Sequence, residues 1–81
     1  MEVNGYKIQP FAKLSRVDLA RTDLTGANLI SANLAHADLT GADLTGTFLT
    51  RADLSDANLT GADLTNANLR AATMPDGTIH D

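Results

Sequence analysis

Leucine recurs at every fifth position through most of this chain, without a break in register. The residue two places before each leucine is small, most often alanine, and the residue between them is usually Asp or Asn. The repeated leucines are Leu14, Leu19, Leu24, Leu29, Leu34, Leu39, Leu44, Leu49, Leu54, Leu59, Leu64 and Leu69, and Met74 and Ile79 continue the count. Any fold of this chain has to accommodate a period of five.

Neither a helix nor a flat strand accommodates it. An α-helix turns by about 100° per residue, so a step of five would turn each leucine by about 140° from the previous one. In a flat strand the side chains alternate, so the same step would place successive leucines on opposite faces. The leucines would be scattered in the first case and divided in the second, so neither element buries them together.

A coil of short extended segments joined by corners does bury them together. Each small residue and its leucine then point inward, and the chain turns before the next small residue. The corners carry residues suited to turns, such as Thr25-Gly26 and Thr40-Gly41, because glycine adopts positive φ and hydroxyl groups bond locally. Successive coils stack about 4.8 Å apart, with leucine on the axis. Spacing alone leaves open whether the coil has three or four sides.

The units Ala27-Asn28-Leu29, Ala37-Asp38-Leu39-Thr40-Gly41 and Ala62-Asp63-Leu64-Thr65-Asn66 resemble the pentapeptide-repeat family, whose pattern is A(D/N)LXX. The resemblance covers about three quarters of the chain. It implies an all-β fold, a right-handed quadrilateral parallel β-helix with four pentapeptides per coil and about three coils. We therefore expect an N-terminal cap over residues 1–11, the β-helix over residues 12–74 and a C-terminal cap or tail over residues 75–81.

Composition narrows the class of function. With no cysteine, the chain forms neither a disulfide nor a thiolate metal site. A net charge of −4 argues against direct binding to a nucleic acid backbone. No apolar run is long enough to span a bilayer, and the first residues lack the basic and apolar regions of a secretory signal. We therefore expect no membrane partner and a cytoplasmic location.

The N-terminal segment departs from the repeat. It contains the only aromatic-rich cluster of the chain, formed by Val3, Tyr6, Ile8 and Phe11. The open ends of solenoids need to be covered, so we expect this cluster to cap the first coil. Asn4-Gly5, inside the segment, is a hairpin-turn signal.

The C-terminal segment also departs from the repeat. Pro75 and Asp76-Gly77 predict the end of the regular coil, with Ile79 folding over the axis or extending its stack. Little bulk remains to close this end. Exposed leucine and unpaired edge groups favour association, so we expect a homodimer through the C-terminal end, and the family resemblance points the same way.

Four units per coil would stack residues that lie twenty apart. This spacing places Asp23, Asp43 and Asp63 in one acidic column, where neighbouring carboxylates repel by somewhat under about 1 kcal/mol. We expect each carboxylate to accept hydrogen bonds from nearby backbone or hydroxyl groups, as turn-forming aspartates do. A weak divalent-cation site and an acidic docking strip are the alternative interpretations.

Phe48 stands where the neighbouring coils carry Asn. A benzyl group there lies outside the coil, near Ile30 of the preceding coil, with Arg51 and Arg70 at the rim. These four residues are the best candidate for an interaction patch in the repeat body. An exposed side chain without a role is the alternative, because single exposed apolar residues are common.

No catalytic set, cofactor site or metal-ligand spacing is found in the sequence, and a filled rod offers no concave pocket. We therefore expect a non-enzymatic structural or protein–protein interaction module, whose partner the sequence does not identify. The resemblance supplies an alternative, because the family includes quinolone-resistance proteins that mimic DNA and bind type II topoisomerases. This chain matches them poorly, since it is shorter, is only mildly acidic and carries arginines among its aspartates.

Overall fold

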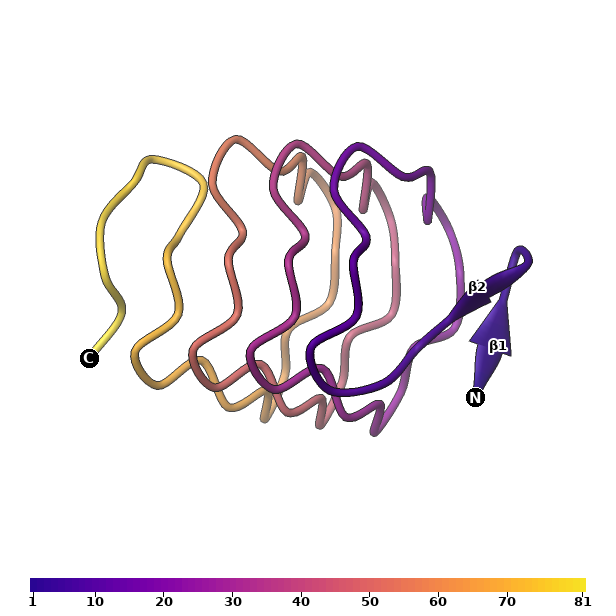
Figure 1. The fold of residues 1–81 in the computed structure, drawn as a ribbon, viewed down its shortest axis with the longest axis horizontal. Helices are drawn as coiled ribbons and strands as arrows, with labels where there is room; N and C mark the ends of the chain where they lie inside the picture. Colours follow the sequence, from indigo (N-terminus) through magenta and orange to yellow (C-terminus); the bar gives the residue numbers. More distant parts are fainter.

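The chain winds into a right-handed coil of stacked turns, with its two termini at opposite ends (Figure 1). The computed structural model describes all 81 residues. All nine parallel bridges between coils join residues twenty apart, beginning with Lys13 and Asn33. Twenty residues are four units of five, so each coil has four sides. Three full coils run over residues 12–71, and residues 72–74 begin a fourth.

The outward-facing middle residue of each unit stacks in a column on its side of the coil. We number the sides 1 to 4 in chain order. The columns are Lys13, Asn33, Asp53 and Thr73 on side 1; Asp18, Asp38 and Asn58 on side 2; Asp23, Asp43 and Asp63 on side 3; and Asn28, Phe48 and Asn68 on side 4. Sides 2 and 4 therefore face away from each other.

Each corner is a tight turn of the same kind. At one of them the N–H of Ala37 donates to the carbonyl of Leu34 over 3.0 Å. Every fifth residue from Phe11 to Ala71 has a positive φ, between 57° and 70°, as the third position of a type II turn requires. Side chains other than glycine cost roughly 1–2 kcal/mol in this conformation. Identical turns at a spacing of five give the square coil.

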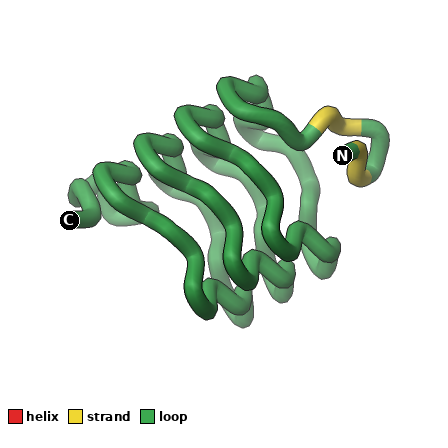
Figure 2. The backbone as a smooth tube through the Cα atoms, turned by 90° about the horizontal axis from the view of Figure 1, so that it is seen from below, coloured by secondary structure: helices red, strands yellow, loops and turns green.

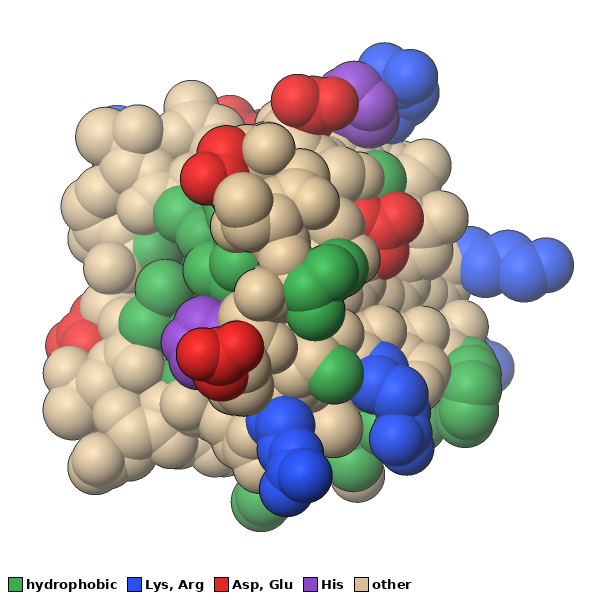
Figure 3. All heavy atoms as spheres, turned by 90° about the vertical axis from the view of Figure 1, so that its left-hand side faces the viewer, with side chains coloured by type: hydrophobic (Ala, Val, Ile, Leu, Met, Phe, Trp, Pro, Cys, Tyr) green, Lys and Arg blue, Asp and Glu red, His purple; other side chains and the backbone are tan.

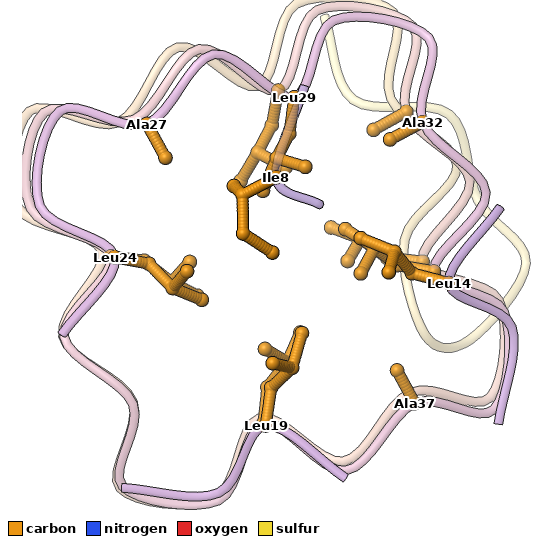
Figure 4. Packing of buried hydrophobic residues seen from close by; sticks show 14 of the residues in the cluster. Ile8, Leu14, Leu19, Leu24, Ala27, Leu29, Ala32 and Ala37 are labelled. Atoms are coloured by element: carbon orange, nitrogen blue, oxygen red, sulfur yellow. The ribbon is translucent and has the colours of Figure 1, made fainter. Parts of the chain in front are cut away.

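The leucines fill the axis. Eight of them, from Leu19 to Leu54, are completely buried, and Leu14 is 2% exposed. Figure 4 looks along the axis and shows Leu14, Leu19, Leu24 and Leu29 pointing to the centre from four sides. The small residues also face inward, and Thr47 is accommodated among them because its hydroxyl donates to the carbonyl of Leu44 over 2.8 Å.

Backbone hydrogen bonds join each coil to the next, and Figure 2 shows the resulting parallel turns. On side 1, the N–H of Leu34 donates to the carbonyl of Asp53 over 2.8 Å, and the N–H of Asp53 donates to the carbonyl of Ala32 over 2.9 Å. Each coil thus presents leucine N–H and alanine C=O groups toward its C-terminal neighbour.

Two short strands precede the coil. Strands β1 (Glu2–Val3) and β2 (Tyr6–Lys7) form an antiparallel hairpin. Asn4 and Gly5 connect them with φ values of 53° and 82°, as a type I′ turn requires. The hairpin delivers Ile8 onto the axis, where it is 4% exposed and lies amid the leucines (Figure 4).

We expected the aromatic residues to form part of this cap, and that prediction was wrong. Tyr6 is 36% and Phe11 is 72% exposed. The reason is geometric, because Phe11 occupies the positive-φ position of the first turn (φ 63°) and its side chain leaves the axis. Two aliphatic side chains close this end instead, because Ile8 is buried on the axis and Val3 packs against the core.

The C-terminal segment folds back on side 1 alone. Thr73 and Ile79 form an antiparallel bridge, with the N–H of Met74 donating to the carbonyl of Thr78 over 2.7 Å. The prediction that Ile79 covers or extends the axial stack was wrong, because this reversal leaves it 62% exposed. Pro75 starts the reversal, and residues 76–80 pair with side 1 rather than crossing the coil.

Candidate interaction surfaces

The carboxylates of the acidic column all accept hydrogen bonds, as expected. Through Oδ1, Asp23, Asp43 and Asp63 each accept the N–H of the threonine two residues later over 3.0 Å. The hydroxyls of Thr45 and Thr65 donate to the same oxygens over 2.6 Å. The aspartates therefore brace the corners that follow them.

These bonds outweigh the repulsion within the column. The hydroxyl and then the N–H of Thr45 hold the pKa of Asp43 below its ordinary value. The pKa of Asp63 is lowered in the same way by Thr65, although the charge of Asp43 opposes the shift. Asp53, on side 1, shows the same lowering of its pKa through Ser55. The bracing is thus a property of the repeat rather than of one column.

The four residues of the predicted patch share one corner region. Phe48 is 48% exposed in the column of side 4, and Ile30 is partly buried at the corner that follows. Arg51 and Arg70 are exposed at the same corner of later coils. Sequence reasoning missed Phe11, whose N–H donates to the carbonyl of Ile30 over 2.9 Å. Its positive-φ position in the repeat was the signal that it belongs to this corner.

The C-terminal end of the coil is open on three sides. Leu59, Leu64 and Leu69 are only partly buried, and their N–H groups have no backbone acceptor. One coil earlier, the N–H of Leu44 is bonded to the carbonyl of Asp63 over 2.8 Å. Figure 3 views this end and shows apolar side chains gathered at its centre within a polar rim. The third coil therefore ends as an unpaired edge around an exposed apolar centre.

One ion pair lies along another corner. His36 Nε2 is 3.5 Å from Asp56 Oδ2, and both side chains are exposed. Such exposed pairs contribute little to stability. No pocket is found on the molecule, and no three His, Asp or Glu side chains are grouped as metal ligands would be. The chain contains no helix with the length and apolar character to cross a bilayer.

Comparison with known proteins agrees with the period of five. A family model described as pentapeptide repeats, in eight copies, matches residues 12–51 and 32–70. Among the curated proteins, none matches this chain.

Solved structures are similar to this coil. The chain is 39% identical to Rfr23, a pentapeptide repeat protein of the cyanobacterium Cyanothece 51142, with a TM-score of 0.73 over 82% of this chain and 45% of that one. It is 37% identical to HetL of Nostoc sp. strain PCC 7120, a protein involved in the regulation of heterocyst differentiation, with a TM-score of 0.51 over 88% of this chain and 42% of HetL.

A third similar structure comes from a plant. A pentapeptide repeat protein of the Arabidopsis thaliana thylakoid lumen is 34% identical, with a TM-score of 0.52 over 83% of this chain and 41% of that one. The chain thus spans less than half the length of these three proteins. The repeat pattern, the four-sided coil and these matches place the chain in the pentapeptide-repeat family.

Proposed function

We propose that this chain is a non-enzymatic protein–protein interaction module, and that it binds through the open C-terminal end of its coil. The observation that carries the proposal is the unpaired edge of the third coil, where leucine N–H groups and apolar side chains are exposed together. An edge of this kind is a template for pairing with another chain.

The occupant that fits this edge is a second copy of the chain. Each open side offers the carbonyl of an alanine and the N–H of the leucine two residues later, such as Ala62 and Leu64. Two such segments related by a two-fold axis run antiparallel, and each donor then faces an acceptor. The N-terminal end is closed by Ile8, which opposes head-to-tail stacking. A closed dimer follows, rather than a filament.

The size of the end sets the strength of this dimer. The molecule measures 29 × 22 × 20 Å, and the open end is no wider than its cross-section. Such an end buries less than the about 800 Å² per partner of a standard interface. We therefore expect a dimer that dissociates on dilution.

Sedimentation velocity over a wide range of concentrations tests this proposal. We expect a concentration-dependent shift from monomer to dimer, which Leu64→Lys abolishes because a charged side chain then lies in the apolar centre of the end. Asp38→Asn, on side 2, is the matched control and keeps the shift. A monomer at all concentrations, or a dimer insensitive to Leu64→Lys, would contradict self-association through this end.

The second candidate function is DNA mimicry directed at a type II topoisomerase. It is supported by the unbroken column of Asp23, Asp43 and Asp63, whose members each leave Oδ2 outside the turn bonds. A supercoiling assay with gyrase tests it. Inhibition that is lost when the three aspartates are changed to asparagine would favour this function over the interaction module.

A further inference from the structure

Phe48 departs from the residue pattern of its column, in which the neighbouring coils carry Asn. In the same column, Asn28 Oδ1 accepts the N–H of Ile30 over 3.2 Å, and Asn68 Oδ1 accepts the N–H of Arg70 over 3.1 Å. Phe48 cannot form this bond, and the N–H of Thr50 has no acceptor in the chain. A side chain that gives up a turn bond and exposes half of its surface conflicts with the local pattern, and such conflicts are typical of functional positions.

The surroundings of Phe48 differ in charge from the rest of the molecule. Side 4 is the only side whose column contains no carboxylate. The corner that follows it carries Arg51 and Arg70, and neither arginine forms an ion pair within the chain. Side 2, opposite, carries Asp18 and Asp38. In a protein with a net charge of −4, the region around Phe48 is thus locally basic, while the other four cationic residues lie within the first 21 residues of the chain.

Apolar contact area extends from Phe48 along the same corner. Ile30 follows Asn28 by two residues, and Asn28 pairs with Phe48 in the adjacent coil, so Ile30 and Phe48 border the same corner. Phe11 lies next to Ile30 through their backbone hydrogen bond and is 72% exposed. We call Phe11, Ile30, Phe48, Arg51 and Arg70 the Phe48 surface.

We propose that the Phe48 surface binds a short acidic segment of another protein, with one apolar side chain of that segment against Phe48 and Ile30 and its carboxylates on Arg51 and Arg70. The inference rests on the proposed function as an interaction module, but it concerns a surface separate from the C-terminal end. Charge complementarity selects this occupant, because carboxylates are repelled from sides 2 and 3 and attracted to this corner.

An anionic membrane is the competing occupant, and the observations favour it less. Only two arginines border the surface, whereas carboxylates stand on the other three sides. An extended sheet of negative charge would be repelled by them, while a narrow peptide can remain on one corner. The test includes vesicles so that this occupant is distinguished.

The experiment uses the full chain and a short synthetic peptide in which glutamates flank a single leucine. NMR titration reports on the backbone amides of Ile30, Thr50 and Arg70. We expect saturable shifts confined to this corner, reduced affinity in high salt, and no comparable shifts with a peptide in which lysines replace the glutamates. Vesicles containing phosphatidylserine are expected not to bind.

Two variants remove the surface without harming the fold. Phe48→Asn recreates the residue of the adjacent coils and should lower affinity about tenfold or more, because the apolar contact is lost. Arg51→Gly places at this turn the residue found at four equivalent turns and should weaken binding while raising the melting temperature. Asp38→Asn is the control on the opposite side and should not weaken binding.

Several results overturn the inference: no shifts with the acidic peptide at millimolar concentration, equal affinity of the Phe48→Asn variant, equal binding of the lysine peptide, or binding of vesicles alone. Sedimentation in the absence of peptide keeps this failure separate from failure of the proposed function. A chain that dimerises through its C-terminal end and ignores the peptide refutes the Phe48 surface only.

Discussion

The two ends of the coil are built from the same repeat but finish differently. Around the first coil, Leu19 and Leu24 are completely buried, and Ile8 covers them. Around the third coil, Leu59 and Leu64 occupy the same position in their units yet remain partly exposed. The burial of a leucine in this fold therefore depends on whether another coil or a cap covers it. Its position within the repeat unit does not decide it.

The flanking segments explain this difference. The hairpin β1–β2 is short, and the residue that follows it directly, Ile8, is apolar and lies on the axis. The C-terminal segment reverses at Pro75 and pairs with side 1 only. It satisfies the backbone of one side, as in the 2.8 Å bond from the N–H of His80 to the carbonyl of Ala72, and leaves the axis open.

The largest expected effect is a difference in lost folding stability between leucine variants in the interior of the coil and at its open end. Leu44→Ala should destabilise the chain by about 3–5 kcal/mol, because it leaves a cavity in a fully packed axis. Leu64→Ala should cost only about 1–2 kcal/mol, since its side chain is already partly in water. Urea unfolding of both variants, at a concentration where the chain is monomeric, measures the two values. Equal losses would show that the third coil is closed.

The next effect concerns the closed end. Ile8→Ala removes the side chain that covers the first coil and should cost about 2–3 kcal/mol. The amides of β1 and β2 should then exchange faster with solvent, because the hairpin loses its anchor. Phe11→Ala is the comparison variant, and it should cost much less because that ring is 72% exposed. A larger loss for Phe11 than for Ile8 would mean that the aromatic residues close this end after all.

Smaller effects are expected at the corners, which are alike from one end to the other. Gly46→Ala should destabilise by about 1 kcal/mol through its positive φ alone, since an added Cβ meets no atom within 4 Å. His36→Gly should stabilise by about 0.5–1 kcal/mol, because glycine relieves the same strain at an entropic cost in the unfolded chain. Melting temperatures of both variants test this prediction, because Gly46→Ala should lower the melting temperature and His36→Gly should raise it. A higher melting temperature for Gly46→Ala would refute it.

The smallest effect is the response to acid. The pKa values of Asp43 and Asp63 are lower in the folded chain than their ordinary value of 3.8, chiefly through threonine hydroxyls. Their contribution to stability is therefore present above about pH 3.8 and is lost as pH falls through the folded-state pKa values. We expect the melting temperature to fall below pH 4. The double variant Asp43→Asn, Asp63→Asn should show a shallower fall, and an unchanged pH profile would contradict the bracing role.

Sequence reasoning predicted the repeated part of the fold well. A period of five excludes helix and flat strand, and the inward leucines with outward Asp or Asn follow from it. The number of sides came from the family resemblance, because spacing of the apolar residues is equally compatible with three. The hydrogen bonds that the aspartates accept from threonine were also predictable, since they depend only on residues two apart in the chain.

The ends were harder to predict because they depend on contacts without a repeat. The register of the repeat places Phe11 at a corner, where a turn with φ 63° directs it outward, but no repeat predicts that Ile8 fills the axis. Ile79 continues the period of five, yet the reversal at Pro75 removes it from the axis. The N–H of Thr50 lacks an acceptor because Phe48 has no side-chain oxygen in place of those of Asn28 and Asn68.

Hydrogen exchange of the leucine amides tests the central claim most directly, with the protein dilute enough to be monomeric. The N–H groups of Leu39, Leu44 and Leu49 are bonded to the next coil and should be strongly protected, whereas those of Leu59, Leu64 and Leu69 should exchange freely. Protection of the second set should appear only at concentrations where the dimer forms. Equal protection of both sets in the dilute monomer would contradict a coil that is closed at one end and open at the other.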